Sequence, residues 1–144
     1  MKARIKWIED VAFACESGSG HAVIADGAPE AGGRNLGPRP MEMVLMGAGA
    51  CSAFDVVEIL RKGRQSILDC IVDIKAERAD THPKVFTSIH FHFILSGTQL
   101  DPAKVERAIQ LSADTYCSAT AMLAKTAKVT HDFEIRPAAS SQIR

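Results

Sequence analysis

The chain has no surplus of charge of either sign. Its 144 residues include 17 Lys and Arg and 17 Asp and Glu, which gives a formal net charge of zero. No basic block stands out along the sequence, and a protein that follows nucleic-acid phosphates needs such a surface. We therefore expect no nucleic-acid partner. Low net charge gives little repulsion between copies, which is compatible with self-association.

We also expect neither a leader peptide nor a membrane-spanning segment. Residues 1–10 contain no apolar segment followed by a small-residue cleavage site, so we expect no secretory signal. The most apolar stretch, 43–60, is interrupted by Asp55 and Glu58, which favours a buried helix and no membrane span. These features predict a cytoplasmic protein.

Cysteine is scarce, and in a reducing cytoplasm free thiols are a better expectation than structural disulfides. Hydrophobic residues make up 47% of the chain and charged residues 24%, as in ordinary globular proteins. The length is that of one domain, which we place at 1–136, followed by a loose C-terminal tail at 137–144. The four cysteines are Cys15, Cys51, Cys70 and Cys117.

Alternating polar and apolar residues predict an N-terminal meander of three strands, followed by a loop rich in Gly and Pro. Residues 41–62 then follow a helical pattern that is apolar on nearly all sides. This helix is therefore expected to be buried all round, against a sheet on one side and a partner on the other. The strands are expected at 2–8, 11–17 and 21–26, and the loop at 27–40.

The second half of the sequence predicts two long strands, two helical segments and a last strand. Because the strands come in consecutive groups, the sequence predicts an α+β fold with mainly antiparallel sheets around the long helix. The two strands are expected at 68–79 and 84–97, the helices at 100–116 and 117–127, and the last strand at 128–136.

Cys51 is the first candidate for chemistry, although a buried cysteine also acts as a small hydrophobic residue. Gly47 and Gly49 precede Cys51 and lower the stability of the helix, so their presence calls for a structural explanation. Either they allow another part of the chain to approach closely, or they kink the helix and place Cys51 near a new N-terminus. The second arrangement favours the thiolate.

Cys117 is the second candidate, because it lies where one predicted helix gives way to the next. A position at a helix N-terminus favours its thiolate, while a small residue that fills the junction is the alternative. Cys15 and Cys70 lie within strand patterns, and Cys70 shares a face with Val72 and Ile74, so both are expected to be inert.

The histidines give a weaker signal. His90 and His92 are two residues apart and lie on one face of a predicted strand, as a metal-binding pair can. The sequence shows no third ligand beside them, so we expect no metal site.

Two motifs together carry a resemblance to a known family. "GPRPMEMVLMGAGACSAFDVVEILRKGRQ" at 37–65 is followed by "LSADTYCSATAMLAK" at 111–125, and Cys117 comes 66 residues after Cys51. In this order and spacing the chain resembles the OsmC/Ohr family of osmotically inducible and organic hydroperoxide resistance proteins, in its OsmC-like branch. The resemblance implies an intertwined homodimer in which two long helices lie between sheets.

The resemblance also implies a two-cysteine peroxidase. The residue matching the attacking cysteine is Cys51, which becomes a sulfenic acid when it reduces an organic hydroperoxide. The residue matching the resolving cysteine is Cys117, which forms a disulfide with Cys51. An external dithiol, such as a lipoyl group, then reduces the pair, and neither a metal nor a bound cofactor is needed.

The sequence departs from the family pattern at two activating groups. The characterised peroxidases place a glutamate ten residues before the first cysteine, whereas here Glu42 lies nine before Cys51, on the opposite face of a continuous helix. Glu42 is therefore either catalytic after a shift of the helix or a first-turn carboxylate that the helix dipole favours. The family's hairpin arginine is missing, and Arg39 or Arg34 can substitute for it.

Without a cation the Cys51 thiol is expected to keep a pKa of about 8.5, and a charged Asp55 one turn away opposes the thiolate. These departures keep open a second hypothesis. It is a non-peroxidatic OsmC-like dimer that binds a small molecule and has weak or no peroxidase activity.

Overall fold

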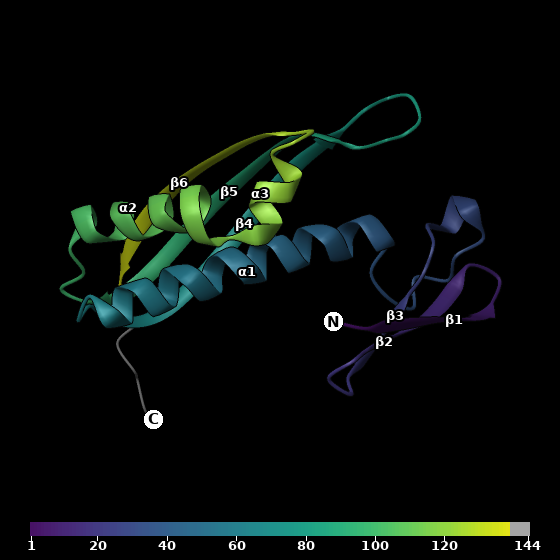
Figure 1. Ribbon diagram of the computed structural model, residues 1–144, viewed down its shortest axis with the longest axis horizontal. Helices are drawn as coiled ribbons and strands as arrows, with labels where there is room; N and C mark the ends of the chain where they lie inside the picture. Colours follow the sequence, from purple (N-terminus) through teal and green to yellow (C-terminus); the bar gives the residue numbers. More distant parts are fainter. Residues whose placement is uncertain (139–144) are drawn as a thin grey trace. The chain divides into compact units, whose positions relative to one another are not determined.

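The computed structural model describes residues 1–138 (Figure 1). The chain divides into two compact units, Met1–Met46 and Gly47–Arg144. Helix α1 (Pro40–Lys62) begins in the first unit and continues in the second. From residue 139 onward, the predicted C-terminal tail lies outside the described residues.

The first unit contains the predicted meander. Strands β1 (Ala3–Glu9), β2 (Ala12–Ser17) and β3 (Ala22–Ala25) pair antiparallel in the order β1-β2-β3. The loop that follows contains one short 3-10 turn at Pro29–Ala31. Alternation of residue types thus located these strands to within about two residues, the usual uncertainty of element ends.

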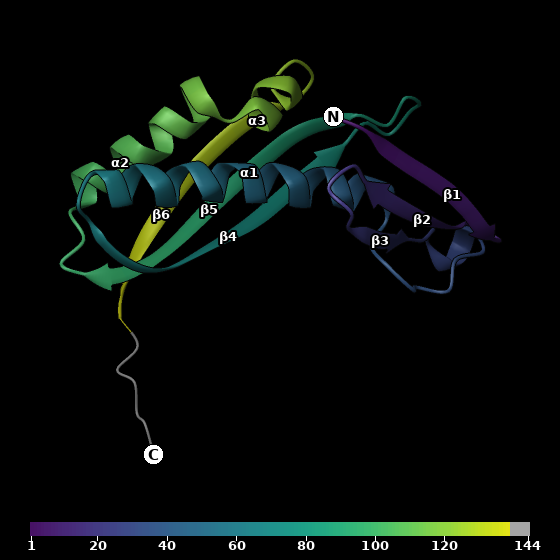
Figure 2. The ribbon, with the colours of Figure 1, turned by 60° about the horizontal axis from the view of Figure 1, so that its bottom comes forward.

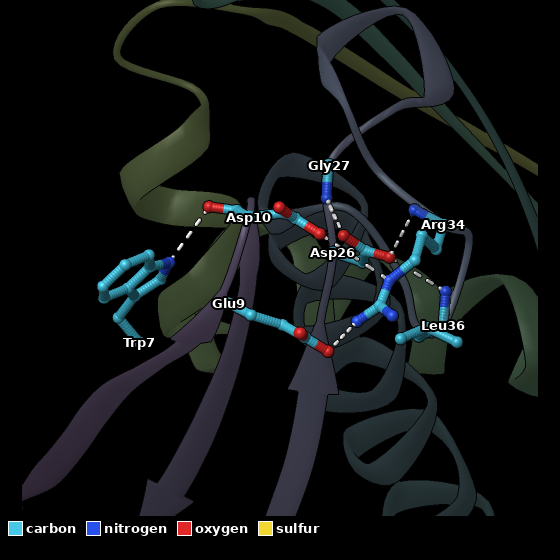
Figure 3. A network of polar contacts seen from close by, with 7 residues as sticks. All are labelled: Trp7, Glu9, Asp10, Asp26, Gly27, Arg34 and Leu36. Atoms are coloured by element: carbon cyan, nitrogen blue, oxygen red, sulfur yellow. Dashed lines mark hydrogen bonds and ion pairs between the residues drawn. The ribbon is translucent and has the colours of Figure 1, made fainter.

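A buried carboxylate organises the loop after β3. Asp26 is 2% exposed, and its two oxygens accept hydrogen bonds from the backbone N–H groups of Gly27, Arg34 and Leu36 at 2.8, 2.9 and 3.1 Å (Figure 3). These bonds lower the pKa of Asp26, with the Leu36 bond contributing most. Gly37 is required nearby, because a Cβ atom there would lie 2.0 Å from the carbonyl oxygen of Ile24. A single side chain therefore fixes the path of the loop into α1.

The second unit has a sheet in the order β4-β5-β6, formed by β4 (Ser66–Arg78), β5 (Phe86–Thr98) and β6 (Lys128–Pro137). Strands β4 and β5 are antiparallel, but β5 and β6 are parallel. A parallel pair needs a long crossover connection, which is provided by α2 (Pro102–Leu111), a π-helical turn (Ser112–Tyr116) and α3 (Ser118–Leu123). The α+β class is confirmed, with one parallel pair in an otherwise antiparallel arrangement.

One face of this sheet is more deeply buried than the other. Along β5, Ile89, Phe91, Phe93 and Leu95 are all at most 2% exposed, whereas the alternate residues His90 and His92 are half-buried. Figures 1 and 2 show α2 and the part of α1 from Gly47 onward on the same side of the sheet. The helices therefore cover the phenylalanine face, and the histidine face is open.

Within this chain the long helix is buried along one side, and burial of its other side by a partner stays a prediction. The buried residues of α1 recur along one stripe, and Phe54, off that stripe, is 68% exposed. By length and composition α1 could also cross a membrane, yet the core helix of a soluble protein has the same properties. The stripe consists of Ala48, Gly49, Ser52, Val56 and Leu60.

Candidate active site

Cys51 and Cys117 come together in the second unit. Cys51 lies on α1 and is half-buried, while Cys117 is 2% exposed and occupies the residue just before α3. Their sulfur atoms and one carboxylate oxygen of Asp55 all lie within 4.8 Å of one another. The structure thus brings together the two cysteines that the sequence singled out, with the carboxylate that it placed one turn from Cys51.

The π-helical turn sets the position of Cys117. Helix α2 ends at Leu111, and the π-helical turn Ser112–Tyr116 follows directly. In this turn the N–H of Cys117 donates to the carbonyl of Ser112, five residues earlier, at 2.8 Å. Cys117 then adopts extended backbone angles, as a helix N-cap does, and its carbonyl accepts a bond from the Thr120 hydroxyl at 3.0 Å. The predicted location at a helix junction is confirmed.

A pair of buried hydroxyls ties the two cysteine-bearing segments together. The oxygens of Ser52 and Ser112 are 3.1 Å apart, and both residues are at most 4% exposed. The Ser112 hydroxyl also donates to the Asp55 carboxylate at 3.1 Å. Sequence analysis missed both serines. Ser52 could have been singled out, because a hydroxyl residue in an apolar helix needs a hydrogen-bond partner when it is buried.

The surroundings of Cys51 raise its pKa. Burial contributes most, followed by a hydrogen bond with Cys117, and the negative charge of Asp55 adds to both. One contact acts in the opposite direction: the backbone N–H of Ala119, near the start of α3, donates to the sulfur. The repulsion expected from Asp55 is present, and the pKa of the Cys51 thiol is raised above its ordinary value.

The two glycines before Cys51 do not create a new helix N-terminus there, because α1 runs unbroken from Pro40 to Lys62. A Cβ atom at Gly49 would instead lie 2.7 Å from Cδ1 of Ile74 on β4. Gly49 therefore allows another part of the chain to approach the helix closely, which is one of the two explanations that the sequence offered. The approaching group is the side chain of Ile74.

Arg39 and Glu42 interact with each other in the first unit. The Glu42 carboxylate accepts the backbone N–H of Arg39 at 2.8 Å and its guanidinium Nη1 at 3.0 Å. Both contacts lower the pKa of Glu42, the backbone bond more than the guanidinium bond. Arg34 is paired with Glu9 (Figure 3). The Glu42 carboxylate is thus bound to Arg39 at the start of α1. Catalytic roles for Glu42 and Arg39 stay predictions.

The other two cysteines lie in strands, as predicted. Cys15 is a half-buried residue of β2. Cys70 lies on β4 opposite Leu95, and burial is the main cause that raises its pKa to about 11. Such a thiol holds its proton at neutral pH and is a poor nucleophile.

Comparison with known proteins identifies the family. The model of the OsmC-like protein family matches residues 32–132. The chain belongs to the OsmC-like family. It is 50% identical over 135 residues to Protein YhfA of Escherichia coli K12, covering 94% of this chain and 98% of YhfA.

Solved structures share this fold over nearly the whole chain. A hypothetical protein from Aquifex aeolicus VF5 is 27% identical, with a TM-score of 0.83, and the match covers 95% of this chain and 96% of that chain. An organic hydroperoxide resistance protein OsmC from Legionella pneumophila is 15% identical, with a TM-score of 0.70 and coverage of 93% and 97%. These matches support the OsmC-like architecture that the two motifs predicted.

Proposed function

We propose that the protein is a thiol-dependent peroxidase that reduces organic hydroperoxides in oxidative stress defence. The observation that carries the proposal is the close approach of the sulfurs of Cys51 and Cys117, within 4.8 Å. A disulfide has an S–S length of about 2.05 Å, so side-chain rotation and a small backbone movement suffice to close the gap. The hydroperoxide resistance activity named for a structural relative supports the same chemistry.

The reaction begins at Cys51. Its thiolate attacks the distal oxygen of the hydroperoxide, the O–O bond breaks, and the alkoxide leaves and takes up a proton to become the alcohol. The Cys51 sulfur loses two electrons and becomes a sulfenic acid. In the second unit, exposed apolar side chains within five residues of one of the two cysteines provide surface for an alkyl group: Phe54, Tyr116 and Met122.

Cys117 completes the oxidation. Its sulfur attacks the Cys51 sulfur, the S–O bond breaks, the S–S bond forms, and the oxygen leaves as water. An external dithiol, lipoyl or another, then reduces the disulfide and is itself oxidised, so the cycle needs neither a metal nor a bound cofactor. We further propose that the working unit is a cytoplasmic homodimer, in which the second copy covers exposed apolar residues of α1 such as Phe54.

Thiol counting after peroxide treatment tests the mechanism. Reduced protein is mixed with cumene hydroperoxide or tert-butyl hydroperoxide, and the remaining thiols are titrated. The wild type should lose the thiols of Cys51 and Cys117 together. Cys117→Ser should lose only Cys51 and form a sulfenic acid that dimedone traps, while Cys51→Ser should keep its thiols. Cys70→Ser is the matched control and should behave as the wild type. Survival of all thiols in a modest excess of peroxide would reject the peroxidase.

The raised pKa of Cys51 favours one alternative, a non-peroxidatic OsmC-like dimer that binds a small molecule. A protein of this kind keeps its thiols in peroxide. It shows a rise in thermal stability with an apolar or thiol-reactive ligand, in the wild type and in Cys51→Ser alike. Absence of any stabilising ligand would count against this alternative.

A further inference from the structure

The open face of the β4-β5-β6 sheet carries a cluster of side chains with metal-ligand chemistry. His90 and His92 project from β5, and Asp132 projects from the parallel neighbour β6, where it is the register partner of His92. The Oδ1 atom of Asp132 lies 3.2 Å from Nε2 of His90 and 2.5 Å from Nδ1 of His92. One donor atom from each residue lies within 4.8 Å of the other two. Sequence analysis identified the histidine pair, and the fold adds the third residue.

We propose that His90, His92 and Asp132 form a binding site for a divalent transition-metal ion of the borderline class that includes Zn²⁺. Imidazole nitrogens and a carboxylate oxygen are the ligands that this class takes in proteins. Three protein ligands leave a fourth position for water, as in open zinc sites.

The cluster is accessible to an ion. The side chains of His90, His92 and Asp132 are 39%, 33% and 59% exposed. Along β5 the two histidines alternate with the buried residues Ile89, Phe91 and Phe93. Partial burial holds the two rings in place, because they stand on a strand between β4 and β6. An ion can therefore enter from solvent without movement of the backbone.

Thr130 gives His90 the second contact that a metal-ligating histidine needs. Its hydroxyl lies 2.8 Å from His90 Nδ1, so Nε2 is the nitrogen that faces Asp132. Without metal, Nε2–H donates to Asp132 and Nδ1 accepts from the hydroxyl. With metal, Nε2 binds the ion and Nδ1–H donates to the same hydroxyl, because a hydroxyl both donates and accepts. The neutral ring thus changes tautomer and keeps both of its contacts.

The charged residues around the cluster are of both signs, and Asp132 supplies the negative charge within it. Hydrogen bonding from His92 is the largest cause that lowers the pKa of Asp132, which keeps the carboxylate ionised. On β4, Asp73 is the register partner of His92 and Lys75 is the partner of His90. Residues opposite each other on one face of an antiparallel pair are neighbours, so Asp73 adds negative charge on the His92 side and Lys75 positive charge on the other.

Zinc titration of the full-length protein tests the site. The test uses the Cys51→Ser/Cys117→Ser variant, because thiols also bind Zn²⁺, after treatment with a chelator and dialysis. Isothermal titration with ZnCl₂ should show one equivalent bound with a Kd on the order of micromolar. Titration with Co²⁺ should give visible absorption bands without the sulfur-to-cobalt charge-transfer band in the near ultraviolet.

Variants on this background decide whether the named residues hold the ion. His92→Ala and Asp132→Asn should each weaken Zn²⁺ binding by at least about tenfold, and Thr130→Val by roughly tenfold through loss of the His90 contact. The matched control is His131→Ala, next to Asp132 but on the other face of β6, which should bind Zn²⁺ as the parent does. Circular dichroism checks that each variant folds, and His92→Gln replaces His92→Ala where it does not.

Three results would overturn the proposal. They are the absence of saturable Zn²⁺ binding at millimolar concentration, binding that His92→Ala and Asp132→Asn leave unchanged, and an equal loss of binding in His131→Ala. Each of these results leaves the peroxidase proposal untouched, because the cluster shares no residue with the cysteine pair.

Discussion

Replacing Asp55 with Asn should make the Cys51 thiol more acidic, because the carboxylate charge opposes the thiolate. The carboxylate oxygen lies within 4.8 Å of the sulfur. At that separation two unit charges interact by about 0.9 kcal/mol at the dielectric constant of water, and by more in a half-buried site. Removing this repulsion raises the ratio of thiolate to thiol at a given pH by at least about fourfold.

The gain in thiolate is offset by weaker nucleophilicity. A more acidic thiol is a poorer nucleophile with a Brønsted slope of about 0.4–0.5, so a fourfold change in acidity lowers the intrinsic rate by about twofold. At neutral pH, where most of Cys51 is protonated, the variant should react about twofold faster than the wild type. At a pH where both thiols are ionised, it should react about twofold slower, so the two pH profiles cross.

The assay is a timed reaction with iodoacetamide across a range of pH, read by mass spectrometry on the peptide that contains Cys51. The Asn side chain keeps an oxygen that accepts the Ser112 hydroxyl, so the local geometry is retained. Glu58→Gln is the matched control, since Glu58 lies two helical turns from Cys51 and pairs with Lys62 at 3.7 Å. Cys70 in the same digest provides an internal reference, because its pKa is raised to about 11.

Two outcomes would refute this reasoning about the Cys51 site. One is a wild-type profile that Asp55→Asn does not shift, which would mean that solvent screens the carboxylate completely. The other is an equal shift in Glu58→Gln, which would mean that the pKa of Cys51 responds to the overall charge of the helix and not to its neighbour.

Three stability predictions follow from the packing and polar contacts. Gly49→Ala should leave the free energy of unfolding nearly unchanged in chemical denaturation, because a gain of about 1 kcal/mol in helix propensity offsets the clash with Ile74. In the Ile74→Val background the same change should raise the free energy of unfolding by about 1 kcal/mol relative to Ile74→Val alone. Asp26→Asn should lower the melting temperature at pH 7. Because folding lowers the pKa of Asp26, its contribution is full above the ordinary pKa of about 3.9, so the gap to the wild type should close as the pH falls below about 4. Ser112→Ala should lower the free energy of unfolding by about 1–3 kcal/mol, because it leaves the buried Ser52 hydroxyl without its partner, and an unchanged value would contradict that role.

Local pattern was sufficient to predict most of the fold. Strand alternation and the 3.6-residue period depend on neighbouring residues, so β1 to β6 and α1 were found close to their observed ends. Helices α2 and α3 end at Leu111 and Leu123, before the predicted ends at 116 and 127. The parallel pairing of β5 and β6 was not predicted, because strand direction depends on where a crossover returns the chain. The single chain covers one stripe of α1, and composition alone does not say which apolar faces of a helix its own chain covers.

The cysteine pair was predicted because both cysteines stand in recognisable local motifs. Its electrostatics could be predicted only in part. Asp55 is one helical turn from Cys51, so its repulsion follows from sequence spacing. Ser112 lies 60 residues from Ser52, and the N–H of Ala119 reaches the Cys51 sulfur only after the π-helical turn has placed Cys117. Contacts of this kind depend on tertiary packing and leave no periodic signal.

The histidine cluster shows where sequence spacing stops being informative. His90 and His92 share a strand face because side chains alternate with a period of two, and that much is local. Asp132 joins them because the crossover sets the register of β6 so that it faces His92 across the ladder. A shift of one residue in that register would bring His131 or Phe133 level with His92 and turn the carboxylate to the other face of the sheet. The third ligand is therefore a property of strand register, which is set by the packing of α2 and α3 and not by the residues near the histidines.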